Sequence, residues 1–209
     1  MTPAFEPSAR SLAQGLSAWV MAWRHPQPMG AAGRCIGRTD LPVDRRKARR
    51  LAHRIRQAAR RHGWPRVVHT SSLQRCALVG RQLRRWGWRH VVDDDLIEAS
   101  FGAWDGRPWA QIPWGEVDAW CADFAGHAPG GGECLRDVMA RVAAWPEAEA
   151  SPTGLPAPPR LVVAHAGWML ARRWLLTHPG LPARAADWPR PPAYGTCWSL
   201  GPSLAASSP

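Results

Sequence analysis

Three features of the sequence predict an α/β domain with a three-layer α/β/α architecture and a mostly parallel central sheet. Short apolar runs with strand character alternate with amphipathic stretches of helical period, which is the order that parallel sheets produce. The 209 residues are enough for one domain with its own hydrophobic core and few for two. A hydrophobic content of 45% and 14 tryptophans exclude a chain that is disordered throughout.

The first part of the chain should supply two strands around a long helix. Residues 19–24 form an apolar run that ends in Arg-His-Pro, where a strand would stop, and residues 27–42 are rich in glycine and proline and indicate a loop. Asp44 can cap a helix that continues to about His62, because apolar residues recur along it at i, i+3 and i+4. Residues 67–69 indicate the second strand.

The rest of the chain continues the alternation. Ser71-Ser72 would cap the next helix and Gly87 would stop it. The Pro-Gly-Gly-Gly run at 129–132 separates two further helices, and the proline-rich residues 146–159 indicate a surface connection. The elements expected here are a helix at 73–86, a strand at 88–92, helices at 109–124 and 133–145, a strand at 160–165, a helix at 166–177 and a strand at 194–200.

Bulk features exclude several classes of protein. No run of about 18 apolar residues exists, so no helix should span a membrane, and the N-terminal apolar run is too short and wrongly flanked for a secretory signal. The five cysteines are widely spaced and include no Cys-x-x-Cys pair, which argues against a zinc ribbon and suits a reducing cytoplasm. We expect a single domain at residues 18–201, an N-terminal extension at 1–17 and a flexible tail at 202–209.

The chain carries a formal net charge of +11, and Lys47 is its single lysine. An excess of this size favours an anionic partner, which the total leaves open between nucleic acid, a membrane surface and a phosphorylated small molecule. The arginine-rich helix, with basic residues at 45–61, could present a basic face to nucleic acid. Because arginine is used along the whole chain, a solvated helix face explains these charges better, and we expect no nucleic-acid partner.

Polar side chains follow three of the expected strands, at the point where each strand ends. Arg24-His25 ends the first strand, Thr70-Ser71-Ser72 follows the second, and His165 ends the strand at 160–165. The carboxyl ends of parallel strands meet at one edge of a sheet and line its ligand crevice. We therefore expect these side chains to lie close together.

Five residues, if they meet in one pocket, could transfer a phosphoryl group without a metal. A neutral imidazole, at His25 or His165, can attack phosphorus near pH 7. The guanidinium groups of Arg24 and Arg75 can hold phosphoryl oxygens, and a carboxylic acid at Glu98 can protonate the leaving alcohol. Each residue alone has an ordinary structural explanation, such as a surface histidine, an ion pair or an exposed acid. Their order and spacing favour catalysis.

Six segments together resemble the histidine phosphatase superfamily, whose fold is phosphoglycerate-mutase-like. In the family's order they match its Arg-His strand, its Gly-x-x-Asp-x-Pro and Ser-x-Leu-x-Arg motifs, its Leu-x-Glu-x-x-Phe-Gly-x-Trp segment, its Pro-Gly-Gly-Glu turn and its closing Val-x-His-x-Gly strand. The matching residues are 20–25, 37–42, 71–76, 96–106, 129–133 and 162–167.

The resemblance implies a role for each residue of the site. His25 would be the nucleophile that becomes a phosphohistidine, and Glu98 would be the proton donor to the leaving oxygen. Water would then hydrolyse the intermediate. The resemblance implies no metal and no cofactor, and a phosphorylated small molecule as the partner. The residues expected to bind that substrate are Arg24, Arg38, Arg75, His165 and Ala166.

Three positions depart from the family's pattern. Pro26 follows the expected nucleophile where most members have glycine or alanine, and Asp105 replaces the usual glutamate. Ala31 stands where many mutases carry an asparagine, which argues against a phosphoglycerate mutase.

The segment at 33–42 is most similar to α-ribazole-5′-phosphate phosphatases of cobalamin biosynthesis, although Ile36 replaces their usual tyrosine. We therefore expect α-ribazole-5′-phosphate as the substrate. The alternatives are a broad-specificity phosphomonoesterase and a phosphatase of phosphohistidine proteins. Four tryptophans of the segment that would cover the site could stack on an aromatic substrate or pack in the core. They are Trp104, Trp109, Trp114 and Trp120.

Overall fold

A five-stranded sheet runs through the computed structural model, which describes residues 19–145 and 157–201. The expected extension at 1–17, the tail at 202–209 and most of the connection at 146–159 lie outside these described residues. In chain order the strands and α-helices are β1 (Val20–Arg24), α2 (Arg45–His62), β2 (Val67–Thr70), α3 (Gln74–Arg84), β3 (Arg89–Val92), α4 (Trp114–Ala122), α5 (Leu135–Ala144), β4 (Arg160–Ala164), α6 (Ala166–Thr177) and β5 (Cys197–Leu200).

The strand order is β3-β2-β4-β1-β5, and only β5 at the edge runs antiparallel to its neighbour. This order confirms the predicted mostly parallel sheet. Arg24 at the end of β1 is in register with Ala164 at the end of β4, and Thr70 at the end of β2 is in register with Val163. The carboxyl ends of these three strands therefore lie along one edge of the sheet, where ligands bind in folds of this kind.

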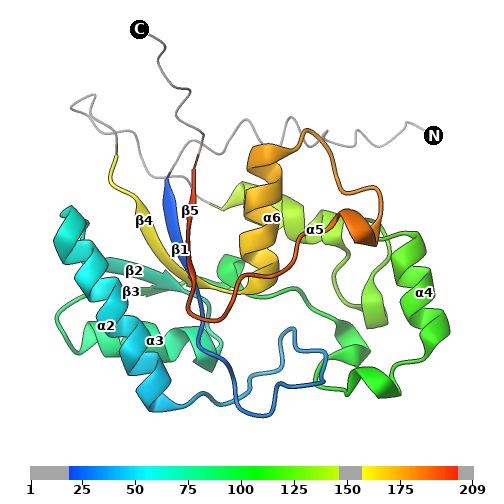
Figure 1. Cartoon of the computed structure of the whole chain (residues 1–209), viewed down its shortest axis with the longest axis horizontal. Helices are drawn as coiled ribbons and strands as arrows, with labels where there is room; N and C mark the ends of the chain where they lie inside the picture. The colour runs from blue at the N-terminus through cyan, green and yellow to red at the C-terminus, as the bar shows by residue number, and fades with distance from the viewer. Residues whose placement is uncertain (1–18, 146–156, 202–209) are drawn as a thin grey trace, which may run out of the picture.

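Helices cover both faces of the sheet, which confirms the three-layer architecture (Figure 1). α2 and α3 pack on one face in a buried cluster that includes Trp23 of β1, and α5 and α6 pack on the other face in a cluster that includes Ala22. Successive side chains of a strand point to opposite faces. Both cores therefore hold β1, the strand that leads directly into His25.

The ends of α2 form as the sequence predicts. Asp44 Oδ1 accepts the backbone N–H of Arg46 at 2.7 Å, and Gly63 closes the helix with a φ of 68°. A side-chain cap of this kind stabilises a helix by about 1 kcal/mol. Glycine adopts a positive φ without the steric conflict of a Cβ atom.

Two expected features of the later helices are wrong. The helix expected at 109–124 begins only after Pro113, as α4, because proline has no N–H for the interior of a helix. Ser71-Ser72 does not cap α3. Instead, Asp40 Oδ1 accepts the N–H of Gln74 at 2.7 Å from a distant loop, and the Ser71 hydroxyl forms a hydrogen bond in the site described next.

Candidate active site

Two histidines and two arginines lie together at the carboxyl edge of the sheet. Arg24 is the last residue of β1 and His25 follows it, His165 follows β4, and Arg75 lies in the first turn of α3. The ring centroids of His25 and His165 are 4.9 Å apart. The structure therefore brings together four of the residues that sequence reasoning selected.

One hydrogen bond decides which nitrogen of His25 is open to a substrate. Nδ1 lies 2.8 Å from the carbonyl oxygen of Pro26, and a carbonyl can only accept, so Nδ1 carries the proton. Nε2 then keeps its lone pair. Burial, together with the positive charge of Arg75 and Arg24, lowers the pKa of His25 to about 3. The ring is therefore neutral, as a nucleophilic imidazole must be.

His165 is also held in a defined neutral form. Its Nδ1 accepts a hydrogen bond from Nε of Arg75 at 3.2 Å, so its proton lies on Nε2, which donates to the hydroxyl of Ser71 at 2.7 Å. Complete burial and the charge of Arg75 keep the pKa of His165 well below its ordinary value. The sequence placed Ser71 among the strand-end side chains expected to meet His165, and this contact confirms that expectation, although the only role the sequence suggested for Ser71 was a helix cap.

Arg75 is buried and positioned by three hydrogen bonds. Besides the bond to His165, NH1 donates to the carbonyl oxygen of Thr39 at 2.7 Å and NH2 donates to that of Gly37. A guanidinium has five N–H groups, which leaves two without a partner among the described residues. Thr39 and Gly37 come from the Gly-x-x-Asp-x-Pro loop, so this loop orients Arg75.

Arg24 is held by the chain that precedes β5. NH1 donates to the carbonyl oxygen of Pro192, and the guanidinium lies 3.9 Å from the ring centroid of Tyr194. The Tyr194 ring also lies 5.5 Å from that of His25. Nε of Arg24 is buried and has no hydrogen-bond partner among residues 19–145 and 157–201. Sequence reasoning missed Tyr194, although it is the single tyrosine of the chain.

Glu98 is a buried carboxyl group in the loop between β3 and α4. It is 8% exposed, and its oxygens accept the N–H groups of Ala99 at 3.1 Å and Gly167 at 3.2 Å. Burial raises the pKa of Glu98, although the two N–H groups and the charges of Arg75 and Arg24 oppose this. A Cβ at position 167 would clash with Oε1 of Glu98, so the glycine permits the close approach. A carboxyl with a raised pKa is suited to donate a proton.

Arg38 is engaged by an acidic neighbour. Its NH2 lies 3.0 Å from Oε2 of Glu133, its Nε lies 3.4 Å from the carbonyl oxygen of Glu98, and its side chain is 42% exposed. It is not among the described residues that line the cavity below. These contacts support the loop that carries Glu98, and a role for Arg38 in binding substrate stays a prediction.

Two residues outside the predicted site also hold this loop. Glu133 Oε2 accepts the backbone N–H of Ser100 at 3.0 Å and pairs with Arg141 at 3.1 Å. Arg141 in turn donates to two carbonyl oxygens of residues 95–97, at 2.8 and 3.0 Å. The pair therefore ties the backbone on both sides of Glu98. The match of Glu133 to the family's glycine-rich turn was the only signal for it in the sequence.

A cavity of about 610 Å³ opens beside Arg24 and Glu98. The first turn of α6, with the predicted Ala166, forms part of its wall, and most of the remaining wall is apolar. Its volume lies in the range of sites for small ligands. The aromatic residues that line it are Phe101, Trp109, Trp120, Phe124, Trp188 and Tyr194.

The four tryptophans of the expected covering segment lie in three different environments: the core, the cavity wall and the exposed surface. Trp104 is buried and donates its indole N–H to Glu116 at 2.7 Å, as a core residue does. Trp109 and Trp120 line the cavity, where they can contact a substrate. Trp114 is 82% exposed and does not line it.

Within residues 19–145 and 157–201, no group of three or more His, Cys, Asp and Glu side chains is arranged to hold a metal ion. Among the described helices, none combines the length and the hydropathy that a membrane crossing would need.

The fold and this cluster of side chains define the class of protein. The profile of the histidine phosphatase superfamily (branch 1) matches residues 20–193, and the chain belongs to that superfamily.

Individual proteins similar to this chain share about a third of its residues or fewer over the aligned regions. The bifunctional protein Rv2228c of Mycobacterium tuberculosis is 32% identical over 135 residues, which are 62% of this chain and 36% of that protein, so the chain spans about a third of its length. The structure of mycobacterial glucosyl-3-phosphoglycerate phosphatase Rv2419c is 28% identical with a TM-score of 0.65, covering 87% of this chain and 88% of that one. The α-ribazole phosphatase from Shigella flexneri has a TM-score of 0.64 and covers 86% and 88%. Its identity of 22% shows the shared fold alone.

Proposed function

We propose that this phosphatase hydrolyses phosphomonoesters through a phosphohistidine formed on His25, without a metal. The observation that carries the proposal is the state of His25. Its Nε2 is unprotonated, and the charges of Arg75 and Arg24 act both on its pKa and on that of Glu98, a carboxyl with a raised pKa. A nucleophile, anion-binding groups and a proton donor are the parts that this chemistry needs.

In the first step, the Nε2 lone pair attacks phosphorus and the bond from phosphorus to the ester oxygen breaks. Glu98 gives its proton to that oxygen, so the alcohol leaves as a neutral molecule. The phosphoryl oxygens are bound by Nε of Arg24 and by the two free N–H groups of Arg75. Charge-assisted bonds of this kind stabilise the transferring group.

In the second step, water attacks the phosphohistidine and the bond from phosphorus to nitrogen breaks. The Glu98 carboxylate takes a proton from this water, inorganic phosphate leaves, and His25 regains its lone pair. The hydrogen bond from Nδ1 to Pro26 holds the ring in one orientation through both steps. Glu98 ends the cycle protonated, ready for the next ester.

We further propose that the substrate is α-ribazole-5′-phosphate. The support is the aromatic wall of the cavity next to Glu98, which suits a leaving group that carries a planar apolar base. A sugar phosphate or a phosphoglycerate carries no planar aromatic base that could stack on this wall. The alternative is a broad-specificity phosphomonoesterase, which would use the same phosphoryl site with no preference for the alcohol. The five free cysteines support a cytoplasmic location.

A substrate panel tests both proposals. It contains α-ribazole-5′-phosphate, ribose 5-phosphate as the matched ester without the base, glucosyl-3-phosphoglycerate and p-nitrophenyl phosphate, each with and without chelator. Stacking of one base is worth about 1–3 kcal/mol, so kcat/KM for α-ribazole-5′-phosphate should exceed that for ribose 5-phosphate by about 5- to 150-fold. Equal values would favour broad specificity. Loss of all activity in chelator would contradict the metal-free mechanism.

A further inference from the structure

The positive charge of the chain is concentrated in one part of the fold. Residues 45–92, which contain α2, β2, α3 and β3, hold 15 of the 27 Lys and Arg and none of the 16 Asp and Glu. The rest of the chain holds 12 basic and 16 acidic residues, so its net charge is −4 against +15 for this segment. Arginine is used along the whole chain, as expected, but the net positive charge is confined to this segment because it lacks acidic residues. The excess belongs to one helical layer and the adjoining edge of the sheet.

Most of these charges face solvent and have no acidic partner. Apart from Arg75 in the catalytic centre and the half-buried Arg56, the basic side chains of the segment are exposed. None of them forms an ion pair within the part of the chain that the structure describes. Like charges held this close together repel one another, and a bound polyanion would relieve that repulsion.

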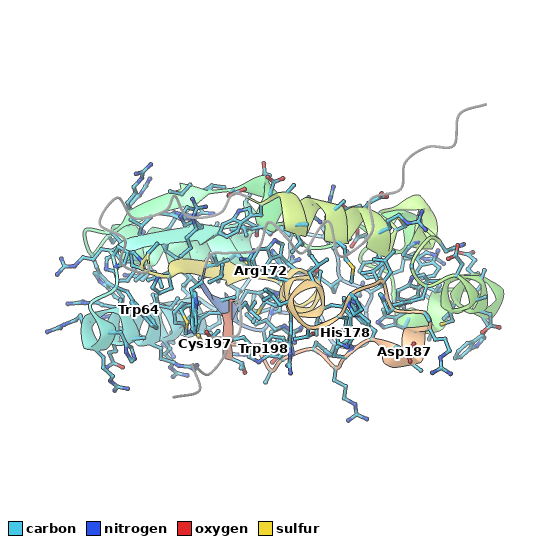
Figure 2. The ribbon with its side chains drawn as sticks, turned by 90° about the horizontal axis from the view of Figure 1, so that it is seen from above. Trp64, Arg172, His178, Asp187, Cys197 and Trp198 are labelled. Atoms are coloured by element: carbon cyan, nitrogen blue, oxygen red, sulfur yellow. The ribbon has the colours of Figure 1, made fainter. Side chains whose placement is uncertain are left out.

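A cleft of about 400 Å³ lies in this segment, remote from the catalytic centre. It forms where α2 ends, β2 begins and α3 turns into β3, that is, at the amino ends of strands β2 and β3. Figure 2 shows Trp64 of this cleft towards one end of the molecule and Asp187, next to the catalytic cavity, towards the other. The side chains that give this Arg/Trp cleft its character are Arg56, Arg60, Arg66, Trp64, Trp86 and Trp88.

The aromatic and cationic groups of the Arg/Trp cleft are interleaved. The guanidinium of Arg56 lies 5.3 Å from the ring centroid of Trp86, and Trp64 stacks on His62 at 4.7 Å. Trp64 and Trp86 are half-buried, so part of each indole remains accessible, and no carboxylate of the described residues lines the cleft. Indole faces beside unpaired guanidinium groups suit a planar base that carries phosphate.

We propose that the Arg/Trp cleft binds single-stranded nucleic acid. One unpaired base stacks on the accessible indole of Trp86 or Trp64, and Arg56, Arg60 and Arg66 contact the flanking phosphates. The exposed arginines of α2 and α3 attract the rest of the strand. A free nucleotide is too short to contact these arginines. A duplex keeps its bases in the stack, so a single strand fits better. An anionic membrane would need protruding aromatic anchors, whereas these indoles are recessed.

Binding of a fluorescein-labelled 12-mer of deoxythymidine, followed by anisotropy at several salt concentrations, tests the proposal. The cleft pair Arg60→Gln/Arg66→Gln is compared with the control pair Arg45→Gln/Arg46→Gln, which removes the same charge at the other end of α2, about 22 Å away. The cleft pair should weaken binding about 10-fold at 0.1 M salt and lower the slope of log Kd against log salt by about 1.4. The control pair should change Kd less than about 3-fold.

A second arm isolates the stacked base. A 12-mer of abasic sites keeps every phosphate, and it should bind at least about 5-fold more weakly than the thymidine strand. Equal binding of the abasic strand, equal losses in the two arginine pairs, or no binding at 0.1 M salt would each overturn the proposal. The proposal would also be overturned if thymidine monophosphate, at the same nucleotide concentration, displaced the labelled strand. It would be overturned as well if the protein bound anionic phosphatidylglycerol vesicles more tightly than the strand. Hydrolysis of p-nitrophenyl phosphate by all variants reports that they are folded.

Discussion

The Nδ1 atom of His25 lies 2.8 Å from the carbonyl oxygen of Pro26, and this contact leaves Nε2 as the nitrogen that can attack. Pro26 stands where most members of the superfamily carry glycine or alanine. The pyrrolidine ring fixes φ, so ψ is the only soft dihedral left to move this carbonyl. The departure from the family's pattern therefore limits the motion of the carbonyl group that orients the His25 ring.

Replacement of Pro26 by glycine should lower kcat by about 3- to 10-fold with little change in KM, because the carbonyl gains freedom and the attacking nitrogen is less well aligned. Steady-state kinetics on p-nitrophenyl phosphate measure this. Pro42→Gly is the matched control, because the Pro42 carbonyl accepts the N–H of Met29 and does not contact a catalytic side chain. An equal fall in both variants would mean that loop stability, and not the orientation of His25, is affected.

His25→Asn should reduce turnover by at least about 10³-fold, because the proposed covalent intermediate forms on the imidazole that this change removes. With ³²P-labelled substrate, the wild-type protein quenched during turnover should carry label that acid removes and base does not, as phosphohistidine does. The variant should carry none. Label that persists in His25→Asn would place the phosphoryl group on a different residue.

Glu98→Gln should separate substrates by their leaving groups. Alkyl phosphates need a proton on the departing oxygen and should lose about 10²- to 10⁴-fold in kcat, whereas p-nitrophenyl phosphate should lose less than about 10-fold. The raised pKa of Glu98 also predicts that the wild-type rate on alkyl phosphates falls as pH rises through that pKa, because the acid loses its proton. A pH profile that is the same in wild type and variant would exclude Glu98 as the acid.

The features that the sequence predicted well depend on local signals. The helix from Asp44 to Gly63 has its period and both caps within one segment. The meeting of Arg24, His25 and His165 follows from the rule that parallel strands end at one edge. The sequence segments matched to the family also bring in Arg75 and Glu98, which no local pattern would place in the site.

The features that the sequence did not reveal depend on partners far apart in the chain. The cap of α3 comes from Asp40, 34 residues before Gln74, so Ser71 seemed the natural candidate. Tyr194 lies beside Arg24 only because β5, which follows it in the chain, pairs with β1. Glu133 contacts the Glu98 loop through folding of the whole domain. Composition and period carry no information on such pairings.

Glu133→Gln should act on the reaction through the Glu98 loop. With its charge removed, the pairs with Arg38 and Arg141 weaken and the carboxyl donor is less well placed. We expect kcat on alkyl phosphates to fall about 10- to 100-fold and kcat on p-nitrophenyl phosphate to fall much less, with KM nearly unchanged. Glu116→Gln is the control, because Glu116 accepts the N–H of Trp104 and does not touch this loop. Equal losses on both substrates would assign Glu133 a purely structural role.

The buried histidines should make the fold sensitive to acid. Burial and nearby arginines lower the pKa of His25 to about 3, from 6.5 in the unfolded chain, and keep that of His165 well below 6.5. Between pH 6.5 and the folded pKa, the unfolded chain binds more protons than the native one, so the free energy of unfolding must fall as pH falls. Each fully buried histidine contributes a slope of about 1 kcal/mol per pH unit.

Urea denaturation at several pH values between 6 and 4.5 measures this slope. Glu98 contributes with the opposite sign, because a raised carboxyl pKa favours the native state as pH falls, but it does so in wild type and histidine variants alike. His25→Gln should therefore reduce the wild-type slope by about 1 kcal/mol per pH unit. If His25→Gln kept the full wild-type slope, His25 would have to be charged in the native protein, and an imidazolium has no lone pair for attack on phosphorus.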